Sequence, residues 1–144
     1  MRAIVQRVHE ASVEIDHKIY ASIKKGFLVY LGVHVADDLK KTHLVADKIH
    51  NLRIFEDEHE KMNLNLSQID GEILVISQFT LYGDTKGNNR PSFIEAAKPK
   101  TAIPLYEAFI KRLSMHHPVK SGVFGSHMNV SSINDGPVTI QIEL

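Results

Sequence analysis

The chain has 144 residues, of which 43% are hydrophobic and 24% charged, and a chain of this size and composition buries one ordinary core. We therefore expect a single domain spanning residues 1–144. Seventeen basic residues balance seventeen acidic ones, which argues against broad electrostatic capture of nucleic acid. We expect no DNA partner. The balance does not exclude a pocket that holds only the end of an RNA.

Cysteine is absent, which excludes disulfides, a thiolate nucleophile and a thiolate metal site. The apolar run at the N-terminus is too short for a signal peptide, and no apolar stretch reaches the roughly 18 residues of a membrane span. We expect a cytoplasmic protein without a membrane partner.

The first third of the chain is predicted to be rich in strands. Alternating or continuous apolar residues predict strands over residues 3–8, 12–15, 19–23 and 27–33. Asp16-His17 is predicted to form a hairpin turn. The run that follows Gly26 is apolar throughout, which is typical of a strand buried on both faces.

A first helix is predicted from about Asp38 to Asn51, with Asp37 as its N-cap. Its buried side is expected to carry the apolar residues that recur at helical spacing, Leu44, Val45, Ile49 and Leu52. Short extended pieces are expected at residues 53–55 and 63–67, on either side of a charged turn.

A central strand is predicted from Ile73 to Ile76, after a turn at Asp70-Gly71. Its apolar run gives way at once to Ser77-Gln78-Phe79-Thr80-Leu81, so the strand leaves the core at this point. The glycines and asparagines of residues 83–89 then predict a loop.

A second helix is predicted from about Ala102 to Met115, with Pro104 in its first turn, where the missing N–H is harmless. Its buried side is expected to carry Leu105, Tyr106, Phe109, Ile110 and Leu113. Three further strands are predicted at residues 119–124, 128–133 and 138–142, with Gly125-Ser126-His127-Met128 continuing the strand pattern.

This order of elements predicts a mixed α/β fold, in which β-rich sheets and two main helices pack in three layers. Asn134-Asp135-Gly136-Pro137 is predicted to be a polar turn between the last two strands. We expect this segment and residues 77–80 to build the functional pocket together.

Nine histidines suggest a metal site, but their spacing does not support one. His43 and His50 are seven residues apart and His116-His117 are adjacent, whereas a zinc helix uses a pair four apart. We interpret them as solvated histidines near helix ends and expect no metal. A phosphate-binding glycine loop and a Gly-x-Ser-x-Gly elbow are both absent.

The polar residues Ser77, Gln78 and Thr80 leave three interpretations open. They could satisfy loose backbone groups at a strand end, as such side chains often do. They could instead supply a hydroxyl nucleophile, which needs a base that no neighbour in the sequence provides. They could also form a polar cradle that orients a substrate.

The two segments Ser77-Gln78-Phe79-Thr80-Leu81 and Asn134-Asp135-Gly136-Pro137-Val138-Thr139 together resemble the motif pair of the D-aminoacyl-tRNA deacylases, also called D-tyrosyl-tRNA deacylases. Four more segments are similar to that family: Val5-Gln6-Arg7-Val8, Lys61-Met62-Asn63-Leu64-Asn65, Arg90-Pro91-Ser92-Phe93 and Gly122-Val123-Phe124-Gly125. The resemblance covers essentially the whole chain. The sequence departs from the family around residues 82–89 and at Ser126-His127.

The resemblance implies an α/β homodimer with each pocket at the dimer interface, and an enzyme that hydrolyses the ester between a D-amino acid and the 3′ end of tRNA without a cofactor. By this resemblance, the pocket is lined by Ser77, Gln78, Phe79 and Thr80. Phe124 and Met128 correspond to positions near the terminal adenine. The partner subunit would insert a cis Gly136-Pro137 bond as a chiral gate, with Arg7 fixing its orientation and Asn134 beside it in the substrate site.

The resemblance also implies that the 2′-hydroxyl of the tRNA assists hydrolysis, so that no histidine triad is required. Glycyl-tRNA mischarged on tRNA(Ala) would be a further substrate. Two alternatives stay open: an esterase with Thr80 as nucleophile, and a non-catalytic module that binds RNA ends. For the tRNA hypothesis we expect basic residues around the pocket mouth, namely Lys24, Lys25, Lys98, Lys100 and Lys120.

Overall fold

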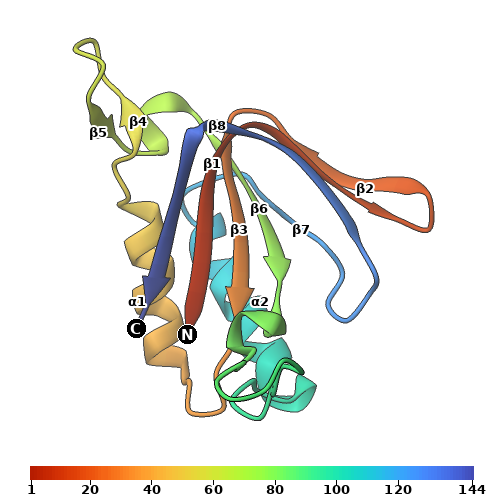
Figure 1. The fold of residues 1–144 in the computed structure, drawn as a ribbon. Coiled ribbons are helices and arrows are strands. Elements are labelled where there is room, and N and C mark those ends of the chain that lie inside the picture. Colours follow the sequence, from red (N-terminus) through yellow and green to blue (C-terminus); the bar gives the residue numbers. More distant parts are fainter.

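One mixed sheet carries the architecture, in a computed structural model that describes all of residues 1–144 (Figure 1). Its strands are β1 (Arg2–Ile15), β2 (Lys18–Ile23), β3 (Gly26–Gly32), β6 (Glu72–Ser77), β7 (Val119–Ser121) and β8 (Asn129–Glu143). They lie in the order β2-β1-β3-β6-β7, and β8 also pairs with β1. The strands β4 (Phe55–Glu56) and β5 (Met62–Leu64) form a separate hairpin.

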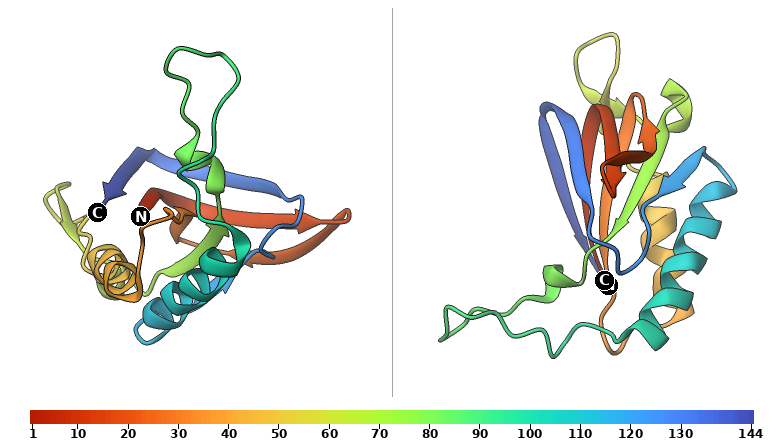
Figure 2. Two further views of the ribbon diagram at one scale, coloured as in Figure 1. Left: turned by 90° about the horizontal axis from the view of Figure 1, so that it is seen from below. Right: turned by 90° about the vertical axis from the view of Figure 1, so that its right-hand side faces the viewer.

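Both helices, α1 (Leu39–His50) and α2 (Pro99–Ser114), cover the same face of the sheet (Figure 2). A cluster of 20 buried apolar residues fills the space between them and the sheet. A second cluster, of 7 residues, lies apart from it, where the sheet curls so that β2 approaches β6 and β7. The predicted mixed α/β class with two helices is confirmed, and its layers are the helices and a nearly closed sheet.

Strand β1 replaces two strands that were predicted separately. The polar pair His9-Glu10 interrupts the apolar alternation, which suggested a break, but both residues stay in the strand and are exposed. The first half of β1 pairs with β3 and the second half with β2, so the exposed pair marks the point at which β1 changes partner. The hairpin turn at Asp16-His17 is confirmed, and both residues have positive φ, 50° and 61°.

Helix α1 and its N-cap both begin one residue later than predicted. Asp38 is the N-cap, because its carboxylate accepts the N–H of Lys41 at 2.7 Å. The carboxylate of Asp37 is already occupied, since it accepts the N–H of His34 at 2.7 Å and the amino group of Met1 at 2.8 Å. The predicted burial of Leu44 is also wrong: its side chain is exposed, while Val45 and Ile49 are buried.

Helix α2 begins three residues before the predicted start, at Pro99, so Pro104 lies inside the helix and not in its first turn. The helix tolerates Pro104 because the carbonyl left without a partner belongs to Lys100, which is exposed to water. Tyr106, Phe109 and Leu113 are buried as predicted, whereas Leu105 and Ile110 are half-buried.

The short elements are shifted by one or two residues. The extended piece predicted at 53–55 is β4, and the one predicted at 63–67 is β5, followed by the 3₁₀ turn η1 (Ser67–Ile69). Neither helix has the length and apolar character needed to cross a membrane.

A histidine cluster joins the C-terminal end of α1 to the segment after α2. His50 Nδ1 lies 2.8 Å from His117 Nε2, and the ring of His116 stacks on His50 with centroids 4.1 Å apart. Only 7% of His117 is exposed, so its interpretation as a solvated histidine is wrong. Burial, together with the neighbouring histidines, lowers the pKa of His117 to about 4.

We predict that stability decreases on acidification because of His117. His117 is protonated below about pH 6.5 in the unfolded chain, but only below about pH 4 in the folded protein. The free energy of unfolding therefore falls as the pH is lowered from about 6.5 to about 4. The loss should be on the order of 2 kcal/mol and can be followed by urea denaturation. The variant His117→Gln should show a shallower dependence on pH. An equally steep dependence in that variant would assign the effect to other groups.

Candidate functional site

A pocket of about 260 Å³ lies at the carboxyl ends of β3, β6 and β7, which are parallel neighbours in the sheet. This edge is where α/β sheets usually bind ligands. The pocket brings together five predicted site residues: Ser77, Gln78 and Phe79 from the first motif, and Phe124 and Met128 from the segment between β7 and β8. Thr80, which was also predicted to line the pocket, is not among the lining residues.

The floor of this pocket is fixed by the end of β6. The buried run before Ser77 pairs in parallel with β3, and Ser77 lies opposite Leu31. The chain then turns into the 3₁₀ turn η2 (Phe79–Tyr82), and the N–H of Gln78 donates to the carbonyl of Leu31 at 2.8 Å. The side-chain amide of Gln78 donates to the hydroxyl of Thr80, whose side chain is exposed.

The wall of the pocket is supplied by Tyr106, which the sequence interpretation placed only in the core. Its hydroxyl donates to the carbonyl of Val75 at 3.0 Å, and its ring meets the edge of Phe124 with centroids 5.8 Å apart. Burial raises the pKa of Tyr106 to about 12, so the hydroxyl remains a neutral donor. Tyr106 therefore ties β6 and the aromatic wall to α2.

Other lining residues were also missed. They come from strand ends, loops and the start of α2: Leu31, Val33, Ala97, Ala102, Gly125, Ser126, His127 and Val130. The predicted continuation of a strand through Gly125-Ser126-His127-Met128 is wrong, because these residues form a turn and loop between β7 and β8. The glycine at position 125 was the one signal for that turn. The loop places an imidazole, His127, at the pocket.

The second motif lies in a bulge of β8, not in a turn between two strands as predicted. Gln6 pairs with Thr139 and Val8 with Asn134, so the single residue Arg7 faces four residues of β8. These four, Asp135 to Val138, are forced out of the ladder while the strand continues on both sides. The Gly136-Pro137 peptide bond in the bulge is cis.

Arg7 and Asn134 fix this bulge on the side that faces the protein. Arg7 Nε lies 3.1 Å from the carboxylate of Asp135, and Arg7 Nη1 donates to the carbonyl of Ile54 at 2.8 Å. Asn134 Nδ2 donates to the carbonyls of Arg7 and Val138 at 2.9 and 3.0 Å. Gly136 has a φ of +121°, which L side chains rarely adopt. The rear of the bulge is thus fixed while Gly136 and Pro137 face outward, exposed.

Within one chain the two motifs do not meet. Arg7 pairs with Phe27, and Phe27 with Ile73, so the bulge lies level with the start of β6 and Ser77 lies four residues further along. Three strand spacings across the sheet and four residues along it separate the two motifs by about 20 Å. None of Arg7, Asn134, Gly136 and Pro137 lines the pocket.

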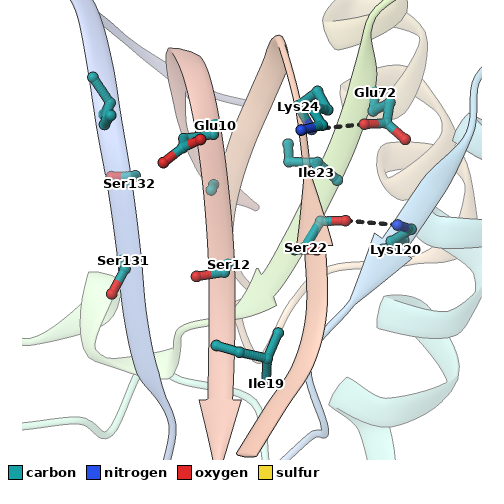
Figure 3. A pocket seen from close by; sticks show the side chains of 12 residues that line it. Glu10, Ser12, Ile19, Ser22, Ile23, Lys24, Glu72, Lys120, Ser131 and Ser132 are labelled. Atoms are coloured by element: carbon teal, nitrogen blue, oxygen red, sulfur yellow. Dashed lines mark hydrogen bonds between the residues drawn. The ribbon is translucent and has the colours of Figure 1, made fainter.

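A larger cavity, of about 620 Å³, lies in the hollow between β1, β2 and β8 (Figure 3). It contains none of the predicted catalytic or substrate-binding residues, and two hydrogen bonds join residues of its lining. Lys120 Nζ donates to the carbonyl of Ser22 at 2.6 Å, and the carboxylate of Glu72 accepts the N–H of Lys24 at 2.7 Å. The predicted place of Lys24 and Lys120 at the pocket mouth is therefore wrong. Lys98 and Lys100, in contrast, flank the lining residues Ala97 and Ala102.

We predict that Tyr106→Phe lowers the free energy of unfolding by about 1 kcal/mol, because it removes one buried hydrogen bond and leaves the ring in place. Chemical denaturation measures the change. Tyr30→Phe is the matched control, since the hydroxyl of Tyr30 has no hydrogen-bond partner in the protein. Equal losses in both variants would show that the bond to Val75 contributes nothing.

Comparison with known proteins identifies the family. The sequence profile of the family described as D-Tyr-tRNA(Tyr) deacylase matches residues 4–143. A protein of Cytophaga hutchinsonii named D-aminoacyl-tRNA deacylase is 54% identical, and one of the same name from Flavobacterium psychrophilum is 51% identical. Each alignment covers 99% of this chain and 97% of the relative.

Among solved structures, the one titled c-Myc DNA Unwinding Element Binding Protein is similar with a TM-score of 0.94 and 38% identity. That superposition covers 100% of this chain and 99% of the other. The profile match over nearly the whole chain and the identity of about half the residues show that the chain belongs to the D-Tyr-tRNA(Tyr) deacylase family.

Proposed function

We propose that this protein is a D-aminoacyl-tRNA deacylase, a hydrolase that releases the D-amino acid from the 3′ end of tRNA as proofreading in translation. The observation that carries the proposal is identity of about half the residues to proteins of that name over nearly the whole chain. The enzyme acts in the cytoplasm as a single domain of residues 1–144, and takes no cofactor. The direct test compares hydrolysis of D- and L-tyrosyl-tRNA by the purified protein.

The working unit in this proposal is a homodimer. The bulge at Gly136-Pro137 is exposed at its front, fixed at its rear, and about 20 Å from the pocket of its own chain, by the strand spacings given above. A two-fold interface is self-complementary, so one contact places each bulge at the other chain's pocket. The homodimer thereby joins the two motifs that the single chain keeps apart.

Selection by handedness then follows from exclusion. D- and L-aminoacyl groups carry the same functional groups, so attraction to the pocket separates them weakly. A fixed main-chain wall that collides with the side chain of the L isomer separates them by repulsion, which is the stronger device. Such a wall tolerates many D side chains. It also admits glycine, so glycyl-tRNA mischarged on tRNA(Ala) becomes a substrate.

Hydrolysis in this proposal uses main-chain donors and the substrate's own 2′-hydroxyl. The first N–H groups of a helical turn have no partner within the turn, which leaves those of Phe79 and Thr80 available to an oxyanion. The hydroxyl of Thr80 is engaged by the amide of Gln78 and has no basic partner. Ser77 and Gln78 orient the aminoacyl-ribose, and Phe124 and Met128 lie against the terminal adenine.

We predict that Thr80→Ala keeps most of the activity on D-tyrosyl-tRNA, within about threefold, since its hydroxyl only orients Gln78. A substrate that ends in 2′-deoxyadenosine should be hydrolysed at least about a hundredfold more slowly. Single-turnover rates measure both.

The alternatives make different predictions. A trapped acyl-enzyme in the wild type and near-complete loss of activity in Thr80→Ala would favour an esterase with Thr80 as nucleophile. Tight binding of the RNA end without turnover at catalytic concentrations of protein would favour a binding module.

We predict that Arg7→Lys weakens the rejection of L-tyrosyl-tRNA. Lysine keeps the charge but cannot bond Ile54 and Asp135 together, so the bulge loses its support. The ratio of kcat/KM for the D over the L substrate should fall by about tenfold, mainly because L hydrolysis rises. Lys41→Arg, at the ion pair between Lys41 and the buried carboxylate of Asp37, is the control. An unchanged ratio in Arg7→Lys would contradict a gate held by Arg7.

A further inference from the structure

Residues 83–92 form an arm that projects from the body beside the pocket (green in Figure 2). Asp84 and Ser92 close its base, because each N–H donates to the other's carbonyl at 2.8 Å. The carboxylate of Asp84 accepts the N–H of Lys86 at 2.9 Å, and Asn88 Oδ1 accepts the N–H of Arg90 at 3.1 Å.

The arm is joined directly to the pocket. The ring of Phe79, a lining residue, meets the edge of Phe93 at the base of the arm with centroids 5.1 Å apart. The same chain segment then returns along the pocket through Ala97 and enters α2. Within residues 83–100, Ala97 lines the pocket and Phe93 contacts the lining residue Phe79, so this stretch runs from the arm past the pocket to the start of α2.

This stretch concentrates positive charge in a protein whose total charge is zero. Residues 83–100 contain four basic residues, Lys86, Arg90, Lys98 and Lys100, against the acidic residues Asp84 and Glu95. All four basic side chains are exposed, and none takes part in an ion pair of the structure. Lys24 and Lys120 also take part in no ion pair, but they line the larger cavity and not the pocket at the strand ends.

We propose that Lys86 and Arg90 on the arm, with Lys98 and Lys100 at the start of α2, bind phosphates of the tRNA acceptor strand that leads out of the pocket. The inference rests on the proposed function for the identity of the RNA. When the last nucleotide of an RNA lies in the pocket, the phosphates of the preceding nucleotides lie beside the pocket. Basic side chains that are not engaged in ion pairs can bind these phosphates. The contacts carry no sequence information, so they serve every tRNA equally.

The test is the charge-reversed variant Lys86→Glu/Arg90→Glu. Its matched control, Lys18→Glu/Lys48→Glu, makes the same change of charge at exposed, unpaired lysines of the β1-β2 hairpin and α1. The first measurement is binding of deacylated tRNA by fluorescence anisotropy across a salt series. The second is kcat/KM on D-tyrosyl-tRNA and on a minimal D-tyrosyl ester of adenosine. Thermal melting verifies that both variants are folded.

We expect the arm variant to bind tRNA at least about tenfold more weakly and to lose about one unit of the log–log salt slope per residue, while the control keeps the wild-type values. Its kcat/KM should fall on D-tyrosyl-tRNA and stay within about twofold of wild type on the minimal ester. Wild-type binding of tRNA by the arm variant, or equal losses on both substrates, would overturn the inference.

The two proposals fail separately. If the wild type hydrolyses neither substrate but its tRNA binding still depends on the arm, the deacylase proposal fails and the phosphate contacts stand. If hydrolysis is intact and the arm variant equals the control, the phosphate contacts fail and the deacylase proposal stands.

Discussion

The close parallel pairing of β3 with β6 is the constraint on which the pocket depends. At its start, Gly26 approaches β6 so closely that a Cβ atom would lie 1.9 Å from the carbonyl oxygen of Glu72, so only glycine fits there. From that contact the register runs without a slip to Leu31 and Ser77. This register places Gln78 and Phe79 at the edge of the sheet, beside the loop that follows β7.

The sequence predicted this edge because its signal is local. An apolar run that ends at Ser77 and is followed by polar residues marks a buried strand at the point where it leaves the core. The bulge was not predicted, because it is defined by pairing: one residue of β1, Arg7, faces four of β8, and no pattern within residues 134–138 reveals that count. The polar, glycine-containing segment has the composition of a turn in both cases.

The remaining errors share a cause, which is that distant contacts decide between options that look equal locally. Asp37 and Asp38 are both suitable N-cap residues by sequence. The carboxylate of Asp37 accepts hydrogen bonds from His34 and Met1, so Asp38 caps the helix. His117 resembles any histidine after a helix until α1 covers it and His50 binds it. The wall residue Tyr106 fits a helix core equally well, and only its bond to Val75 links it to the pocket.

Total charge is a poor guide to a nucleic-acid partner when the charges are segregated. With 17 basic and 17 acidic residues overall, and four basic against two acidic in residues 83–100, the rest of the chain holds 13 basic and 15 acidic residues. Residues 83–100 therefore carry a net charge of +2, and the rest of the chain carries a net charge of −2. Such a surface attracts a polyanion at one border and repels it elsewhere, which orients the RNA without raising affinity for nucleic acid in general. An enzyme that must release its RNA after each turnover gains from this arrangement, because each phosphate contact that is not made lowers the barrier to dissociation.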